Sequence, residues 1–146
     1  MSLIQALLNP IAYPHAVGKI ELIETSESVF FEIGSANLKK GAKIILDKLG
    51  KEIGKLPNPV EIEGHTDSRK YSSGAAYTNW ELSADRANST RRFLEGHGFW
   101  DGQVTQVTGF ADRKLKTPEN PFDIKNRRIA ILIRYLKESD FTGNKK

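Results

Sequence analysis

The fold is decided by residues 38–67, which read LKKGAKIILDKLGKEIGKLPNPVEIEGHTD. In the first part of this stretch, apolar residues recur at three- and four-residue steps with lysines between them, which predicts an amphipathic helix over residues 38–56. The residues expected on its buried face are Leu38, Ala42, Ile45, Leu49, Ile53 and Leu56. Pro57 and Pro59 end the helix, and residues 60–63 then alternate apolar with acidic side chains, as a half-buried strand does.

The segment before this helix supplies another sheet element. Residues 20–33 combine aliphatic and aromatic side chains with polar ones, which is typical of a strand or a hairpin. With the helix and the strand that follows, they complete a β-α-β unit. Residues 1–19 are interrupted by Pro10 and Pro14, so we interpret them as a linker or docking arm in front of the domain.

The rest of the chain adds one helix and two strands. We expect a polar surface loop over residues 66–79 and a second helix over about 80–95. They are followed by a short strand over 104–109, an irregular loop over 110–125 and a last strand over 129–133. Asn79 is the expected N-cap of the second helix. The last strand reads IAILI without alternation, which indicates a strand inside the sheet, buried on both faces.

These elements define one domain over residues 20–137, followed by a polar tail over 138–146. The β-α-β-α-β-β order predicts an α+β protein, a two-layer α/β sandwich with helices on a mixed four-stranded sheet. A length of 146 residues and 27% charged residues suit a single folded domain. The net charge of +4 favours polyanions only weakly, and the absence of cysteine fits either a reducing or an oxidising compartment.

Two polar clusters are candidates for recognition. Gly64-His65-Thr66-Asp67 ends the strand over 60–63, and residues 79–87 (NWELSADRA) open the second helix. Ligands commonly dock where strand ends meet helix N-termini, so we expect Asp67 and Arg86 to face one cleft near the surface. A carboxylate and a guanidinium together suit a zwitterion such as an amino-acid head group. The alternative, equally compatible with the spacing, is that Asp67 and Arg86 pair with each other.

Structural roles and other functions also fit these residues, and for Asn79, Tyr77 and Trp80 the structural role is favoured. Asn79 can serve as a cap, and Tyr77 and Trp80 are expected to pack rather than to bind a ligand. A metal-dependent hydrolase would use His65 and Asp67, but the pattern offers no third ligand, so we expect neither an enzyme nor a cofactor. A nucleic-acid surface could be built from Lys39, Lys40, Lys43, Arg91, Arg92, Arg127 and Arg128. Acidic residues are mixed among these cations, which favours a solvated face and no nucleic-acid partner.

The motifs Gly-His-Thr-Asp, Asn-x-x-Leu-Ser-x-x-Arg-Ala and a late Asn-Arg-Arg, in this order, resemble those of OmpA-like domains over about residues 20–136. The resemblance implies binding of the peptidoglycan stem peptide at diaminopimelate, with Asp67 taking the amine and Arg86 the carboxylate. It further implies a pocket lined by Ser35, Thr66, Asn79, Leu82 and Arg127.

The insertion after Asp67 and the phrase at 79–87 resemble the MotB-type flagellar stator proteins within this family. That likeness implies a periplasmic domain tethered to the inner membrane by a missing transmembrane helix, which would join a MotA-type stator subunit. It also implies a homodimer, for which Ile4, Leu7 and Leu8 in the arm are candidate contacts. A wall-anchoring domain of an outer-membrane, Pal-type or type VI secretion protein is the alternative.

Overall fold

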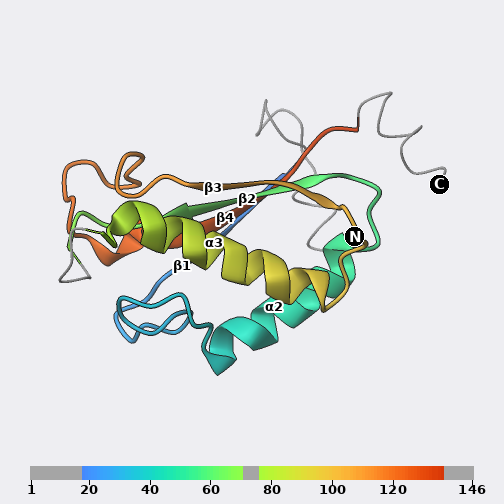
Figure 1. The fold of residues 1–146 in the computed structure, drawn as a ribbon, viewed down its shortest axis with the longest axis horizontal. Helices are drawn as coiled ribbons and strands as arrows, with labels where there is room; N and C mark the ends of the chain where they lie inside the picture. The colour runs from blue at the N-terminus through green and yellow to red at the C-terminus, as the bar shows by residue number, and fades with distance from the viewer. Residues whose placement is uncertain (1–17, 71–75, 137–146) are drawn as a thin grey trace.

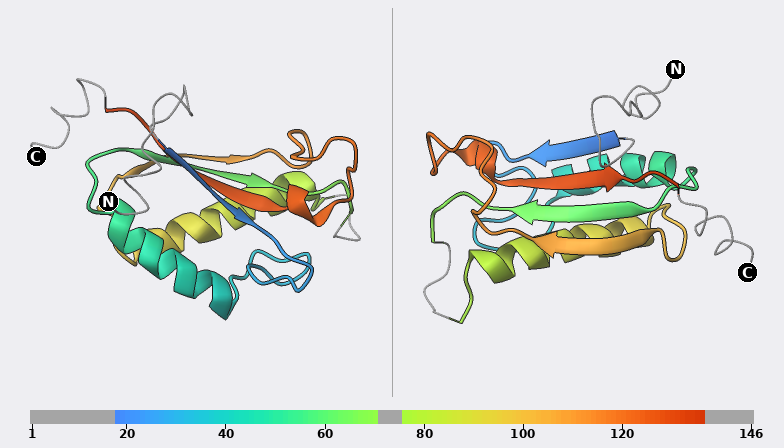
Figure 2. Two further views of the ribbon diagram at one scale, coloured as in Figure 1. Left: turned by 180° about the vertical axis from the view of Figure 1, so that it is seen from behind. Right: turned by 90° about the horizontal axis from the view of Figure 1, so that it is seen from above.

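The computed structural model describes residues 18–70 and 76–136, and it shows two helices on one face of a four-stranded sheet (Figures 1 and 2). The strands are β1 (Gly18–Ile23), β2 (Val60–His65), β3 (Val104–Gly109) and β4 (Arg128–Ile133), and the helices are α2 (Lys40–Ile53), α3 (Asn79–Glu95) and the single 3-10 turn η1 (Ile124–Asn126). The predicted two-layer sandwich and its element order are confirmed. No helix in the described residues is long and apolar enough to cross a membrane.

The strands lie in the order β1-β4-β2-β3. Strand β4 runs antiparallel to both of its neighbours, and β2 runs parallel to β3, so the sheet is mixed as predicted. The interior position predicted for the last strand is confirmed. Ala130 is fully buried although it faces away from the core, because it lies between the longer side chains of Glu21 and Glu63 on the two adjacent strands. The strands of the first β-α-β unit are separated by β4 and do not pair with each other.

The buried face of α2 differs from the predicted one. It consists of Ala42, Leu46, Gly50 and Ile53, whereas Ile45 is 37% exposed. Ala42 and Ile53 belong to both faces, but Leu46 and Gly50 are buried where Ile45 and Leu49 were expected. The helix is therefore turned from the expected orientation by less than the roughly 100° that separates consecutive residues. Gly50 accounts for this turn, because its missing side chain lets the segment after α3 approach closely, and a Cβ there would overlap the His97 carbonyl.

The start of α3 also corrects a prediction. Thr78, not Asn79, is the N-cap: its hydroxyl accepts from the backbone N–H of Trp80, and the carboxylate of Glu81 accepts from the backbone N–H of Thr78. This reciprocal capping box satisfies N–H groups that the helix itself leaves without partners. The side chain of Asn79 is thus available for contacts outside the helix.

The core lies between the sheet and the helices. Its buried members are Leu22, Phe31, Leu46, Ile53, Val60, Ile62, Ala87, Leu94, Phe99, Ile129, Ile131 and Ile133. Strand β1 begins at Gly18, two residues earlier than the predicted domain boundary. The rest of the predicted arm, with Ile4, Leu7 and Leu8, and the predicted tail lie outside the described residues.

Candidate functional site

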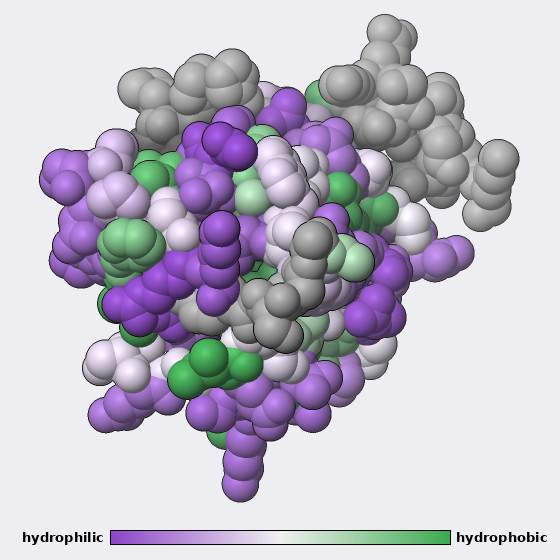
Figure 3. Space-filling view, turned by 60° about the vertical axis from the view of Figure 1, so that its left-hand side comes forward, coloured by the Kyte–Doolittle hydropathy of each residue, from purple (hydrophilic) through white to green (hydrophobic). Residues whose placement is uncertain are grey.

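One end of the molecule gathers the segments that carry the sequence motifs. The loops after β2 and β3, the N-terminus of α3, η1 and the segment between β1 and α2 all lie at the left in Figure 1. Because β2 and β3 are parallel, their carboxyl ends meet there, as in other α/β ligand sites. Figure 3 shows a mainly hydrophilic surface from this side, with only isolated hydrophobic patches.

Asp67 is the centre of this end. It lies two residues beyond β2 and is completely buried, contrary to the expected position near the surface. Its Oδ2 accepts from Arg127 Nε at 2.7 Å, and its Oδ1 accepts from the backbone N–H of Arg69 at 2.8 Å. A buried carboxylate is stable only when paired and hydrogen-bonded, and both conditions hold here.

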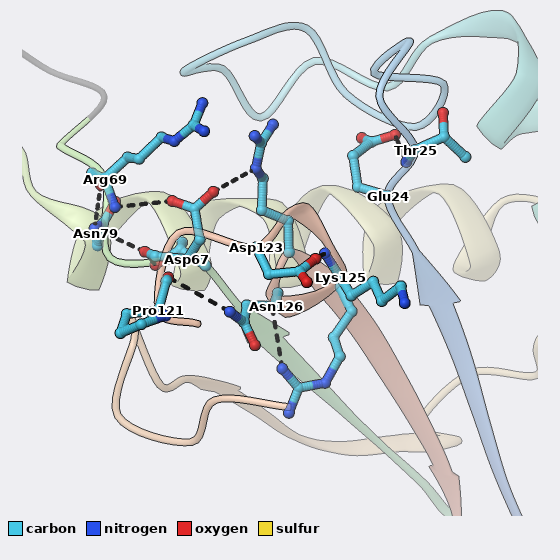
Figure 4. Close-up of polar contacts among 12 residues, drawn as sticks. Glu24, Thr25, Asp67, Arg69, Asn79, Pro121, Asp123, Lys125 and Asn126 are labelled. Carbon is cyan, nitrogen blue, oxygen red and sulfur yellow. Dashed lines mark hydrogen bonds and ion pairs between the residues drawn. The ribbon is translucent and has the colours of Figure 1, made fainter. Parts of the chain in front are cut away.

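Two predicted residues support the backbone around Asp67, and Figure 4 shows the first of them, Asn79. The side-chain amide of Asn79 donates to the carbonyls of Arg69 at 2.7 Å and Asp67 at 3.3 Å. Thr66 is buried; its hydroxyl donates to the Asp67 carbonyl at 2.8 Å, and its N–H donates to the Ala111 carbonyl at 2.9 Å. Asn79 and Thr66 therefore position Asp67 through its main chain.

Asn126 is a positioning residue that the sequence analysis did not select. It is fully buried, accepts from the backbone N–H of Thr117 at 2.8 Å, and donates to the carbonyls of Asn120 and Pro121. Pro121 in turn accepts from the backbone N–H of Ser68. The late Asn-Arg-Arg motif was the available signal, because its first residue organises the loop and its second pairs with Asp67.

Arg86 is held by the segment between β1 and α2. It is 5% exposed; its Nε donates to the Ser35 carbonyl at 2.8 Å and its Nη2 to the Glu32 carbonyl at 3.2 Å. The guanidinium carbon lies 4.9 Å from the ring centroid of Phe31, a cation–π geometry. Gly34, with φ of 66°, makes the tight turn that presents the two carbonyls.

Glu24 organises the same segment, and it too was not predicted from the sequence. Its carboxylate accepts from the backbone N–H groups of Thr25, Phe30 and Phe31. The only sequence signal is an acid placed directly after an apolar strand. Glu24 also donates through its backbone N–H to the carbonyl of Arg127, which ties this segment to the strand that follows η1.

Arg86 and Arg127 line one small hollow. Its walls are formed by Leu22, Glu24, Phe30, Phe31, His65, Arg86, Arg127, Arg128 and Ile129. About 10 Å³ is open to the centre of a water molecule, which is close to the space one water needs. The hollow thus joins the two predicted arginines, but in this conformation it is too small for an amino-acid head group.

The predicted site residues divide into three groups. Asp67, Thr66, Asn79 and Arg127 form one bonded cluster, and Arg86 with Ser35 forms a second beside the hollow. Leu82 is 1% exposed and packs inside as a core residue. The structure shows an ion pair of Asp67 with Arg127.

His65 is buried at the end of β2, as expected for a structural residue. Its Nε2 lies 3.1 Å from Glu63 Oε1, and its ring stacks on Phe110 at 5.0 Å. Burial lowers the pKa of His65, while the hydrogen bond from His65 lowers the pKa of Glu63. Among residues 18–70 and 76–136 no three histidine, aspartate or glutamate side chains are grouped to hold a metal ion.

The aromatic residues at the start of α3 differ from the packing role expected for them. Trp80 is 47% exposed, with the Arg113 guanidinium 5.7 Å from its ring centroid. Tyr77 donates its hydroxyl to Asp85 at 2.8 Å, and burial together with this carboxylate raises the pKa of Tyr77 to about 12. Trp80 is exposed because its helix position faces solvent, away from the core face at Leu82.

Comparison with known proteins agrees with the motifs and the fold. The profile of the OmpA family matches residues 30–128. The chain belongs to the OmpA family. This OmpA-family chain is 38% identical over 116 residues to Motility protein B of Escherichia coli K12, an alignment that covers 79% of this chain and 38% of that protein. The chain therefore spans well under half of the length of that relative.

Solved structures share the OmpA-family fold. The periplasmic domain of Helicobacter pylori MotB matches with a TM-score of 0.71 at 19% identity, covering 88% of this chain and 89% of that one. The cell wall anchor of the type VI secretion system of Pseudomonas aeruginosa matches with a TM-score of 0.69 at 21% identity, covering 92% and 98%. At these identities the likeness establishes the fold alone.

Proposed function

We propose that this OmpA-family domain binds peptidoglycan without catalysing a reaction, at the diaminopimelate-containing stem peptide, and so anchors a flagellar stator complex to the cell wall. The observation that carries the proposal is a fully buried carboxylate, Asp67, next to Arg127, with Arg86 on the same hollow as Arg127. Opposite charges held this close are suited to the ammonium and carboxylate of one amino-acid head group.

The contacts of each group support a specific role. Asp67 receives the ligand ammonium, and Arg127 orients the carboxylate. Arg86 receives the ligand carboxylate, because the Ser35 and Glu32 carbonyls and the Phe31 ring set the plane of its guanidinium beforehand. Preorganisation of this kind lowers the entropy cost of binding.

Binding requires the hollow to open. The space of about 10 Å³ is much smaller than a diaminopimelate head group, so side chains around it must move aside when the ligand enters. The half-buried Phe30 is a wall residue that can do so. Leu82 contributes only by packing beneath the site, whereas Thr66 and Asn79 keep the backbone of Asp67 in place.

The wider setting of the proposal rests on the relatives. A motility protein is 38% identical to this chain, and one structural neighbour is called a cell wall anchor. On this basis we place the domain in the periplasm, tethered to the inner membrane, as a homodimer that joins a MotA-type stator subunit. A wall anchor of an outer-membrane, Pal-type or type VI secretion protein would use the same site and differ in what precedes the domain.

Co-sedimentation of the purified chain with peptidoglycan sacculi tests the site. Because Asp67 and Arg86 are buried, we choose the near-isosteric Asp67→Asn and the uncharged Arg86→Gln rather than alanine. Each should weaken binding by roughly one to two orders of magnitude, which is the effect of losing one hydrogen bond to a charged group.

Matched controls separate the site from general charge effects. Asp112→Asn lies in a loop at the same end, and Arg91→Gln lies on the same helix as Arg86, where its partner is Glu95. Both should bind like wild type, and circular dichroism should show all variants folded. Wild-type protein that stays in the supernatant would overturn the proposed function, and equal binding by Asp67→Asn and Asp112→Asn would overturn the site.

A further inference from the structure

A second, larger hollow lies between the two helices, which are side by side on one face of the sheet (Figure 2). It is an open groove lined by Ala36, Asn37, Leu38, Lys43, Ser89, Arg92 and Phe93. Its space is about 520 Å³, compared with about 10 Å³ for the hollow at Arg86 and Arg127. This volume lies within the range of ligand-binding clefts.

The groove carries positive charge on both walls. Lys43 extends from α2 and Arg92 from α3, and both are exposed. Within the described part of the chain, neither lies within ion-pair distance of a carboxylate; Arg92 Nη2 contacts Ser89 Oγ at 3.2 Å. Farther along α2, by contrast, Lys51 pairs with Asp47 at 3.0 Å. The cations of the groove therefore have no acidic partner in the described residues.

Two more lysines lie beside the groove at an unfavourable place for the helix. Lys39 is the N-cap residue and makes no side-chain cap, Lys40 follows it, and the first turn of α2 has no acidic residue. Positive side chains at the positive end of a helix dipole lower the stability of that helix. Local helix stability therefore does not explain them, while they do add to the positive potential over the groove.

The groove and the proposed stem-peptide site are built in part from the same two segments. Ser35, whose carbonyl holds Arg86, is followed directly by Ala36 on the groove wall. On α3, Ser89 and Arg92 follow Arg86 at successive three-residue steps, so they lie along one side of the helix. The two hollows thus lie near each other in the chain, with Arg86 lining the first and Arg92 the second.

We propose that this groove is a second anionic subsite, in which Lys43 and Arg92 bind the free carboxylates of a neighbouring stem peptide on the same peptidoglycan strand. The inference rests on the proposed function, because it assumes that the wall polymer occupies the first site. Stem peptides repeat along the glycan and each carries carboxylates, so a strand held at one stem presents further anions next to it. The positive charge of Lys43 and Arg92 is complementary to the negative charge of these carboxylates, which is why we propose this occupant.

Sacculus binding as a function of salt tests the subsite. We compare wild type with the double variant Lys43→Gln/Arg92→Gln between about 0.1 M and about 1 M salt, where the screening length falls from about 10 Å to about 3 Å. At the lower salt concentration the variant should bind roughly threefold to tenfold more weakly, as expected for two exposed ion pairs. At the higher concentration the two proteins should bind alike.

A charge-matched control and a charge-preserving variant complete the experiment. Lys48→Gln/Lys55→Gln removes the same charge, and Lys48 lies five residues from Lys43, about 140° around the helix. This control and Lys43→Arg/Arg92→Lys should both bind as wild type does, and circular dichroism checks folding. If wild type binds but the groove variant matches the Lys48 control, the subsite is wrong; if wild type does not bind, the proposed function fails and the subsite with it.

Discussion

Asp67 and Arg127 form an ion pair whose side chains are 0% and 10% exposed, and its two residues are 60 positions apart in the chain. Removing one partner of such a pair leaves the other charge buried without compensation. The pair therefore couples ligand recognition to the stability of the fold. This is why the wall-binding test needs substitutions that keep the shape of the side chain.

A double-mutant cycle should reveal this coupling. We expect Asp67→Ala to lower the free energy of unfolding by about 3–5 kcal/mol, because it leaves the Arg127 guanidinium buried opposite an apolar side chain. The double variant Asp67→Ala/Arg127→Met should lose clearly less than the sum of the two single variants. Urea unfolding gives the three values, and simple additivity would show that the pair is not coupled.

His65 should make stability depend on pH. Burial lowers its pKa below the ordinary 6.5, so below about pH 6.5 the unfolded chain binds a proton that the folded chain does not. The free energy of unfolding should therefore fall as pH decreases from 7.5 to 5.5, by at most about 1.4 kcal/mol per pH unit from this one group.

The variants His65→Gln and His97→Gln assign this pH dependence. His65→Gln removes the titrating group and should flatten the slope between pH 7.5 and 5.5, whatever its effect on stability at pH 7.5. His97, at the end of α3, is exposed, and His97→Gln should keep the wild-type slope because His65 is intact. An unchanged slope in His65→Gln would mean that other groups cause the pH dependence.

At the level of elements, α2 and the turn after α3 are joined through glycines. Gly98 has φ of 127°, a conformation that side chains disfavour, and a Cβ there would overlap the backbone of Gly50 and Lys51. Gly50 lies on the buried face of α2. This close approach sets the rotation of α2, because the helix must present Gly50 rather than a larger side chain to the turn.

Alanine at Gly98 should therefore be much more costly than alanine at a glycine with open surroundings. Gly102 provides the matched control: its φ is 86°, and nothing lies within 4 Å of where a Cβ would be placed. We expect Gly102→Ala to cost about 1–2 kcal/mol from backbone strain alone. Gly98→Ala should cost about 3 kcal/mol or more, because overlap with α2 is added to the strain. Equal losses in thermal or urea unfolding would rule out the close approach.

At the scale of the whole molecule, the stator proposal requires two domains to associate. The apolar residues Ile4, Leu7 and Leu8 in the predicted arm are the candidate contacts. Light scattering on the full chain at high concentration should give the mass of a dimer, and replacing these three residues by serine should shift it toward the monomer. A monomeric mass of the unsubstituted chain at high concentration would contradict the stator proposal. The alternative, a wall anchor that acts as a single domain, would then be favoured.

Much of this architecture follows from local patterns. The three-to-four-residue period of residues 38–56, the alternation at 60–63 and the continuous apolar run at 129–133 indicate element types and their order, because helices and strands repeat their apolar residues at different periods. The motif around Asp67 and the helix with Arg86 could be found for the same reason, since each is a short segment with its own residue pattern.

The arrangement of these elements depends on contacts between distant residues. The insertion of β4 between β1 and β2, the choice of Leu46 over Ile45 for the core, and the pairing of Asp67 with Arg127 all involve segments that no local pattern connects. Burial of Asp67 and Arg86 likewise arises only when three loops and a helix meet at one end of the sheet. Local periodicity identifies the type of each element and its approximate apolar side, whereas the neighbours that pack around a side chain decide its partner and its burial.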